Sequence, residues 1–264
     1  MSETPNYKYI YGPVTSWRIG KSLGIDPISS SQKTCSFDCV YCQAWKTESL
    51  TGEREVFVST EDLVDELRSL PEVAIDYITF AGNGEPTLAK NLGEMIRAVK
   101  IFRKEKIAVI TNSSLIDRKD VQEDLLCADL VEAKLDACSM DSLNQMNRPA
   151  PGILWENILE GLKTFRKIYR GRLVLQIMFV RTNQAFAGEI AKIAREISPD
   201  EIAINTPLRV NAVKPLAAEP LGEITSIFRK VCGETIPVRS VYESKREKSR
   251  PFCQESTDRR RGKE

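Results

Sequence analysis

The stretch Cys35-Ser-Phe-Asp-Cys39-Val-Tyr-Cys42 places three thiols within eight residues, in the spacing C-x3-C-x2-C. Thiolates on so short a loop can converge on one soft metal centre. The chain has no histidine and no second C-x2-C pair, so it offers no complete ligand set for a structural zinc site. A cubane iron–sulfur cluster, by contrast, can be held by three thiolates with one iron left open to another ligand. The pattern therefore favours an iron–sulfur cluster.

With the aromatic Tyr41 directly before its third cysteine, this loop resembles the cluster-binding signature of the radical S-adenosylmethionine (radical SAM) superfamily. The resemblance implies that Cys35, Cys39 and Cys42 hold a [4Fe–4S] cluster whose open iron binds the amino and carboxylate groups of SAM. It also implies that the reduced cluster cleaves SAM to a 5′-deoxyadenosyl radical, which abstracts hydrogen from a substrate. The alternative is a group of free cysteines that serve as small buried apolar residues, although these rarely follow this pattern.

Composition describes a globular protein with no overall electrostatic preference. The chain has 264 residues, 42% of them hydrophobic, and a net charge of +1 from 38 basic and 37 acidic residues. A balanced charge gives no global argument for nucleic-acid binding. Seven cysteines without a signal peptide favour a reducing cytoplasm, and no apolar run approaches membrane-spanning length. We therefore expect a cytoplasmic protein with no membrane partner.

Apolar periodicity predicts strands that alternate with helices. The expected strands cover residues 75–81, 107–111, 130–135, 173–180, 201–205 and 237–241. The expected helices cover residues 59–70, 92–102, 121–126, 158–168, 187–197 and 219–231. Such alternation is typical of βαβ units around a parallel sheet, and about six units are too few for a closed eight-stranded barrel. The sequence thus predicts a single-domain α/β fold, a partial (β/α)6 TIM-like barrel with parallel strands.

The two ends of the chain differ from this core in composition. Residues 1–34 predict an irregular N-terminal extension with one or two short strands, and residues 35–242 the radical SAM partial-barrel core. Residues 243–264 are dense in charged residues, with little apolar besides Phe252 and Cys253. Because such a segment buries little apolar surface, we expect a flexible tail. Its basic residues leave open the binding of a polyanion.

The loop Gly82-Asn-Gly-Glu-Pro86 directly follows the strand expected over 75–81. Ligands of parallel α/β sheets bind at the carboxyl ends of the strands, so this loop lies where a ligand is expected. Glycines let the backbone approach a ligand closely, and Glu85 offers an acceptor for a cationic amine. The loop lacks the third glycine of the dinucleotide fingerprint. The alternative interpretation is a Gly-Pro turn that happens to carry an acid.

The resemblance to radical SAM enzymes extends to these strand ends. It implies that Gly82, Gly84 and Glu85 belong to the loop that holds the amino group of SAM, and that Tyr41 lies beside the adenine. The other residues it places near SAM are Thr111, Asn112, Ser113, Lys134, Asp136 and Asn205. A polar residue that merely caps a helix is an equally good reading for each of these. The charged candidates for substrate contact or catalysis are Lys134, Asp136, Arg148 and Arg181, and Arg18 is either a surface charge or a partner of an anionic group.

Several short motifs resemble a little-characterised radical SAM subgroup that is similar to the wyosine-type tRNA-modifying synthases. They span residues 11–215 and comprise Gly12–Ile25, Lys134–Asp136, Asn147–Pro149 and Asn205–Pro207. Those synthases carry additional upstream cysteines for a second cluster, whereas this chain has none before Cys35. Its other cysteines, Cys127, Cys138, Cys232 and Cys253, lack ligand spacing. We therefore expect neither a second cluster nor wyosine synthesis.

The leading hypothesis is a radical SAM enzyme, oxidoreductase-like in the broad sense, that receives its electron from a donor such as a ferredoxin or flavodoxin. Its substrate, whether a small molecule, a protein or tRNA, stays open. One alternative is a tRNA base-modifying enzyme, which needs a basic face; the candidates are Arg166, Lys167, Arg170 and Arg172, or these simply form a solvated helix end. Another is a non-catalytic iron–sulfur electron carrier, which explains the cysteines but not the Gly82–Pro86 loop.

Overall fold

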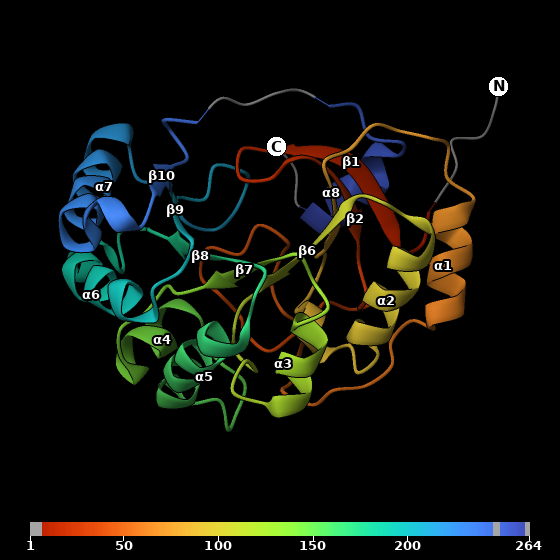
Figure 1. Cartoon of the computed structure of the whole chain (residues 1–264). Helices are drawn as coiled ribbons and strands as arrows, with labels where there is room; N and C mark the ends of the chain where they lie inside the picture. Colours follow the sequence, from red (N-terminus) through yellow and green to blue (C-terminus); the bar gives the residue numbers. More distant parts are fainter. Residues whose placement is uncertain (1–6, 245–248, 262–264) are drawn as a thin grey trace.

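A computed structural model of the protein describes residues 7–244 and 249–261. Its main sheet has the strand order β1-β2-β5-β6-β7-β8-β9-β10, so neighbouring strands follow one another along the chain. β1 pairs antiparallel with β2, and every later pair in this sheet is parallel. The sheet curls into a half-barrel (Figure 1), which confirms the expected single-domain partial TIM-like barrel.

The strands of the main sheet are β1 (Ile10–Ser16), β2 (Gly20–Ile25), β5 (Tyr77–Phe80), β6 (Lys106–Thr111), β7 (Leu130–Lys134), β8 (Arg172–Met178), β9 (Glu201–Asn205) and β10 (Val238–Ser240). A separate two-stranded sheet pairs β3 (Thr34–Cys35) with β4 (Ser49–Leu50). The cysteine loop therefore begins on a short strand that lies outside the main sheet.

Helices connect the parallel strands and cover the outer side of the half-barrel (Figure 1). They are α1 (Thr60–Arg68), α2 (Leu92–Phe102), α3 (Lys119–Leu125), α4 (Met140–Met146), α5 (Trp155–Ile168), α6 (Ala187–Ile197) and α7 (Ala218–Cys232). Short 3-10 turns occur at Pro86–Leu88, Gln184–Phe186 and Gly233–Thr235. Helix α4 was not among the predicted helices. Within the described residues, no helix has the length and apolar character needed to cross a lipid bilayer.

Local sequence explains where the first helix begins and what it buries. The side chain of Ser59 accepts a hydrogen bond from the backbone N–H of Asp62, so it caps an otherwise unpaired donor of α1. Leu63 and Leu67, one turn apart, are fully buried and pack into the main apolar core. Burying a leucine contributes about 1.5–3 kcal/mol. The same helical spacing of apolar residues fixes the other outer helices against the sheet.

The N-terminal segment contains the short strands that were expected within residues 1–34, but they belong to the main sheet and not to a separate extension. Residues 10–25 form two strands of the main sheet, and β2 pairs in parallel with β5. Ile10, Leu23 and Ile25 are completely buried in the core. The six strand–helix units therefore begin with β2, upstream of the cysteines, and continue through β9 and α7. Residues 1–6 lie outside the described part of the chain.

The C-terminal segment also differs from the flexible tail that was expected. Helix α8 (Gln254–Arg261) lies beside β1 (Figure 1). The backbone N–H of Phe252 donates to the carbonyl of Gly12 at 2.6 Å, and Thr257 Oγ1 accepts from the Gly12 N–H at 3.2 Å. Polar contacts thus order a segment that has little apolar surface to bury. Residues 245–248 and 262–264, which the same expectation covered, lie outside the described residues.

Candidate functional site

A cavity of about 750 Å³ opens at the carboxyl ends of the parallel strands. Its wall contains the last residues of four successive strands or their direct neighbours: Ala81 after β5, Thr111 of β6, Lys134 of β7 and Met178 of β8. The further lining residues that carry candidate chemistry are Lys33, Cys35, Cys39, Tyr41, Cys42, Gly82, Asn83, Gly84, Glu85, Asn112 and Asn205. The fold therefore brings the three cysteines and the Gly82–Pro86 loop to one cavity.

Each of the three sulfur atoms faces a nitrogen donor from a nearby side chain. The pairs are Asn112 Nδ2 with Cys35 Sγ at 3.7 Å, Asn147 Nδ2 with Cys39 Sγ at 3.3 Å, and Lys33 Nζ with Cys42 Sγ at 2.9 Å. Donors of this kind stabilise the thiolate form that binds metal and tune the potential of an iron–sulfur cluster. The donor set thus fits a thiolate-bound cluster.

Burial controls the protonation of two of these thiols. It raises the pKa of Cys35 to about 12, with a further contribution from the Glu85 carboxylate, and the pKa of Cys39 to about 11. Both groups are therefore thiols at neutral pH in the protein without metal, and metal binding must release their protons. Among the described residues, no three Cys, Asp or Glu side chains converge tightly enough to hold one metal ion. A cubane does not require this, because each cysteine binds a different iron.

Glu85 lies buried at the rim of the cavity with its carboxylate held by neighbouring donors. Its Oε1 accepts from Thr87 N at 3.0 Å, Thr87 Oγ1 at 2.7 Å and Thr111 Oγ1 at 2.6 Å, while Oε2 accepts from Asn112 N at 2.7 Å. Burial nevertheless raises the pKa of Glu85, and these hydrogen bonds oppose the rise. Since Oε2 has a single donor from the described residues, it keeps a lone pair for a ligand ammonium.

The two glycines of this loop lie where no side chain fits. A Cβ on Gly84 would lie 2.1 Å from the carbonyl oxygen of Thr34, which belongs to the chain entering the cysteine loop. A Cβ on Gly82 would lie 2.3 Å from Cγ of Asp26. Gly84 therefore lets the Glu85 loop pack directly against the cysteine loop, as close backbone approach requires.

Tyr41 joins a buried polar network next to the cysteines. Its hydroxyl contacts the carboxylate of Asp136, and Lys134 Nζ lies 3.2 Å from that hydroxyl and 4.6 Å from the ring centroid. Asn147 Nδ2 lies 3.1 Å from the same hydroxyl. The other oxygen of Asp136 accepts from Met178 N at 2.7 Å. Asp136 therefore orients Tyr41 and the end of β8, and Lys134 is the charged member of this group that lines the cavity.

The remaining predicted residues divide between the cavity and the outer surface. Asn205 lines the cavity, and its side chain accepts from Thr206 N at 2.9 Å. Ser113 is buried with φ of +68°. Arg148 has a side chain that is 60% exposed and lies 3.7 Å from Asp38, and Arg181 is exposed; neither lines the cavity.

Three of the basic residues predicted to bind an anion or form a basic face are paired with carboxylates. Arg18 lines the cavity, and its Nε donates at 2.8 Å to Glu132, a buried carboxylate on β7. Arg166 forms an ion pair with Asp200 at 3.0 Å, and Arg172 pairs with Glu201. Lys167 and Arg170 are exposed. The charges of Arg166 and Arg172 are therefore already matched by carboxylates, which weakens the case for a basic face built from these four residues.

Sequence reasoning missed three residues that the structure places at this site. Lys33 and Asn147 donate to cysteine sulfurs, and Asp26 accepts from the backbone N–H of Asn83 at 3.3 Å. Lys33 precedes the first cysteine by two positions, which is the only signal the sequence carried for it. Asn147 belongs to a quoted motif, but its contact with Cys39 spans 108 residues and depends on the fold.

Comparisons with known proteins identify relatives of this chain. A family model described as the Radical SAM superfamily matches residues 29–203. The UPF0026 protein slr1464 of Synechocystis is 42% identical over 211 residues, which cover 80% of this chain and 78% of that protein.

Two solved structures share the fold at low sequence identity. A radical SAM methyltransferase from Sphaerobacter thermophilus matches with a TM-score of 0.62 and 17% identity, over 83% of this chain and 66% of the other. Archaeal TYW1 matches with a TM-score of 0.57 and 15% identity, over 82% and 73%. The family match over most of the chain, with three thiols beside a glycine-rich acidic loop, shows that this protein belongs to the radical SAM superfamily, whose cofactors are a [4Fe–4S] cluster and S-adenosylmethionine.

Proposed function

We propose that this protein binds a [4Fe–4S] cluster through Cys35, Cys39 and Cys42 and uses it to cleave SAM for hydrogen abstraction from a substrate. The observation that carries the proposal is the shared cavity: the three thiols and Glu85 line the same wall. When bound, the reduced cluster and SAM supply the 5′-deoxyadenosyl radical that removes the hydrogen atom. The protein's own part is to bind, orient and shield these groups.

The chain holds the amino-acid end of SAM through the Gly82–Pro86 loop. Glu85 accepts the ammonium group through Oε2, and its buried position strengthens this charge pair relative to one in water. Asn112 holds the same oxygen through its backbone N–H at 2.7 Å and reaches Cys35 Sγ with its side chain at 3.7 Å. One residue thus fixes the distance between the ammonium site and the cluster site.

Tyr41, Gly82, Gly84, Thr111 and Asn205 complete the SAM site in this proposal. Tyr41 is 3% exposed, and Lys134 Nζ lies over the face of its ring. Tyr41 therefore positions Lys134, which presents its positive charge to the cavity. Thr111 keeps Glu85 in place by donating to Oε1. Because each of these groups is held before SAM arrives, little ordering is required on binding.

An anaerobic assay tests this function. The protein is reconstituted with iron and sulfide and reduced chemically, SAM is added, and 5′-deoxyadenosine is measured beside Cys39→Ala and Cys127→Ala variants. We expect product from the wild type and from Cys127→Ala, because Cys127 lies two residues after the end of α3 and does not line the cavity. Cys39→Ala should give neither a complete cluster nor product.

The spectrum of the reduced cluster provides the second arm. SAM should change the electron paramagnetic resonance signal of the wild type even if cleavage of SAM requires the true substrate. A cluster that forms fully but neither responds to SAM nor yields 5′-deoxyadenosine would overturn the proposal and favour an electron carrier.

A further inference from the structure

Helix α8 forms part of the wall of the cavity that holds the cysteines. Thr257, Asp258, Arg260 and Arg261 of this helix line the cavity. The helix is linked through Thr257 to β1, at the edge of the half-barrel. The C-terminal end of the described chain thus returns to the site, more than 200 residues after the cysteine loop.

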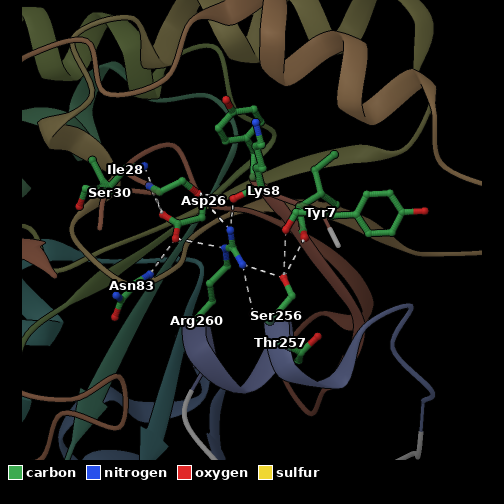
Figure 2. Close-up of polar contacts among 12 residues, drawn as sticks. Tyr7, Lys8, Asp26, Ile28, Ser30, Asn83, Ser256, Thr257 and Arg260 are labelled. Atoms are coloured by element: carbon green, nitrogen blue, oxygen red, sulfur yellow. Dashed lines mark hydrogen bonds and ion pairs between the residues drawn. The ribbon is translucent and has the colours of Figure 1, made fainter. Parts of the chain in front are cut away.

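A buried ion pair anchors α8 to this wall. Arg260 Nε lies 3.3 Å from Asp26 Oδ2, and both side chains are 2% exposed (Figure 2). The other guanidinium nitrogens donate to Ser256 Oγ at 2.7 Å, Ser29 Oγ at 3.3 Å and the Lys8 carbonyl. One arginine therefore ties its own helix to the segment that follows β2.

Asp26 extends this link to the loop proposed to bind SAM. The oxygen that faces Arg260 also accepts from the backbone N–H of Asn83 at 3.3 Å, as Figure 2 shows. The second carboxylate oxygen of Asp26, Oδ1, accepts from the backbone N–H groups of Ile28 and Ser29 at 3.2 Å each. Gly82, whose missing Cβ would collide with Asp26, lets the loop approach that carboxylate. Asn83 lies two positions before Glu85, so the Asp26 carboxylate fixes the first half of the Gly82–Pro86 loop.

We propose that Arg260 is a positioning residue for the SAM-binding loop, and that α8 is therefore a required part of the cofactor site. The inference rests on the proposed function, since that function makes Gly82–Pro86 the SAM loop. The physical reason is that a buried carboxylate needs a positive partner to stay ionised. Without the guanidinium, Asp26 loses the charge that makes it a strong acceptor for Asn83 N–H.

The test compares Arg260→Gln, Asp26→Asn and the double variant with Arg259→Gln as a matched control. Arg259 is the neighbouring arginine on the same helix, is exposed and does not line the cavity. Arg260→Lys is the conservative variant, because it keeps the charge while losing the fork of donors. The dissociation constant for SAM is measured by calorimetry on anaerobically reconstituted protein, with cluster content checked by iron and sulfide analysis.

Two further readouts separate positioning from general stability. Hydrogen–deuterium exchange on a peptide covering residues 81–88 reports the order of the loop without SAM. The electron paramagnetic resonance change caused by SAM reports how SAM approaches the cluster. Arg260→Gln should weaken SAM binding by about tenfold, a loss of the size found when the outer partner of a metal ligand is removed. It should also speed exchange in the loop, with a normal cluster content.

The double variant should bind SAM about as weakly as the weaker of the two single variants, because Arg260 and Asp26 act through the same contact with Asn83. Arg259→Gln should match the wild type, and Arg260→Lys should fall between the wild type and Arg260→Gln. A folded Arg260→Gln with wild-type SAM affinity and wild-type loop exchange would overturn the proposal. If Arg260→Gln does not fold, the nearly isosteric Asp26→Asn variant replaces it, and wild-type SAM affinity with wild-type loop exchange in that variant would overturn the proposal.

These outcomes are distinct from a failure of the proposed function. Wild-type protein with a complete cluster that does not bind SAM would contradict the function itself. The exchange experiment, which needs no SAM, would still show whether Arg260 orders the loop.

Discussion

The backbone N–H of Asn112 donates a 2.7 Å hydrogen bond to Glu85 Oε2, across 27 residues of sequence. Glu85 follows β5 and Asn112 follows β6, so the pair joins two neighbouring strand ends. The side chain of Asn112 continues to Ser36 Oγ at 2.9 Å, next to the first cysteine. The acidic loop and the cysteine loop are thereby held in one fixed arrangement before any cofactor binds.

Replacing Glu85 with glutamine should weaken SAM binding by at least about tenfold, because a charge-assisted hydrogen bond contributes about 1.5–3 kcal/mol. The amide keeps the size of the side chain but removes its charge. Calorimetry on reconstituted protein measures the dissociation constant. Glu94→Gln, an exposed change on α2, is the control and should bind SAM like the wild type. Equal affinities for Glu85→Gln and the wild type would contradict the role given to Glu85.

The affinity for SAM should also depend on the ionisation of Glu85. Burial raises the pKa of this carboxyl above its usual range. A raised pKa means that Glu85 takes up a proton at a higher pH than an exposed glutamate, and only the ionised form pairs with the SAM ammonium. Affinity should therefore be full above the raised pKa and fall as the pH drops through it, at a higher pH than for an exposed glutamate. Titrations at a series of pH values should show this fall in the wild type and its loss in Glu85→Gln.

Introducing alanine at Gly84 should disturb both loops at once. Its Cβ would lie 2.1 Å from the Thr34 carbonyl oxygen, and backbone atoms cannot move aside as a flexible side chain can. We expect a loss of about 1–3 kcal/mol in the free energy of unfolding, as for other overpacked sites. Denaturant unfolding of the metal-free protein measures the change.

Gly222 on α7 supplies the control for that experiment. A Cβ at this position meets no atom within 4 Å. Gly222→Ala should therefore stabilise the protein by up to about 1 kcal/mol, because alanine favours the helix. A Gly84→Ala protein as stable as the wild type would show that the two loops can separate without cost.

Removing the amide of Asn147 should shift the potential of the bound cluster. Its Nδ2 lies 3.3 Å from Cys39 Sγ, and hydrogen bonds to ligating sulfurs favour the reduced, more negative cluster. Asn147→Leu should lower the reduction potential by tens of millivolts, as a redox titration monitored by electron paramagnetic resonance would reveal. Asn144→Leu, an exposed change on α4, the helix that Asn147 follows directly, should leave the potential unchanged. An unaltered potential in Asn147→Leu would remove Asn147 from the cluster environment.

The sequence by itself predicted the cluster type, the strand–helix alternation and the partial barrel. Three thiols in C-x3-C-x2-C spacing and a glycine-rich acidic loop are local patterns, and their chemistry follows from residue type and short-range spacing. Helical and strand periodicity is local too, since it reports which side of each element is apolar. These features could therefore be predicted without knowledge of the tertiary contacts.

Tertiary structure alone decided which distant groups meet at the site. Asn147 reaches Cys39 across 108 residues, and Arg260 reaches Ser29 across 231, which no local pattern encodes. The tail was expected to be flexible because it has little apolar surface. Helix α8 is nevertheless ordered, because Arg260 pairs with the buried carboxylate of Asp26, directly after β2. One or two short N-terminal strands were expected, but only the pairing of β2 with β5 makes β2 part of the barrel. Hydrogen bonds and ion pairs between remote segments depend on the folded arrangement, whereas periodicity records only local burial.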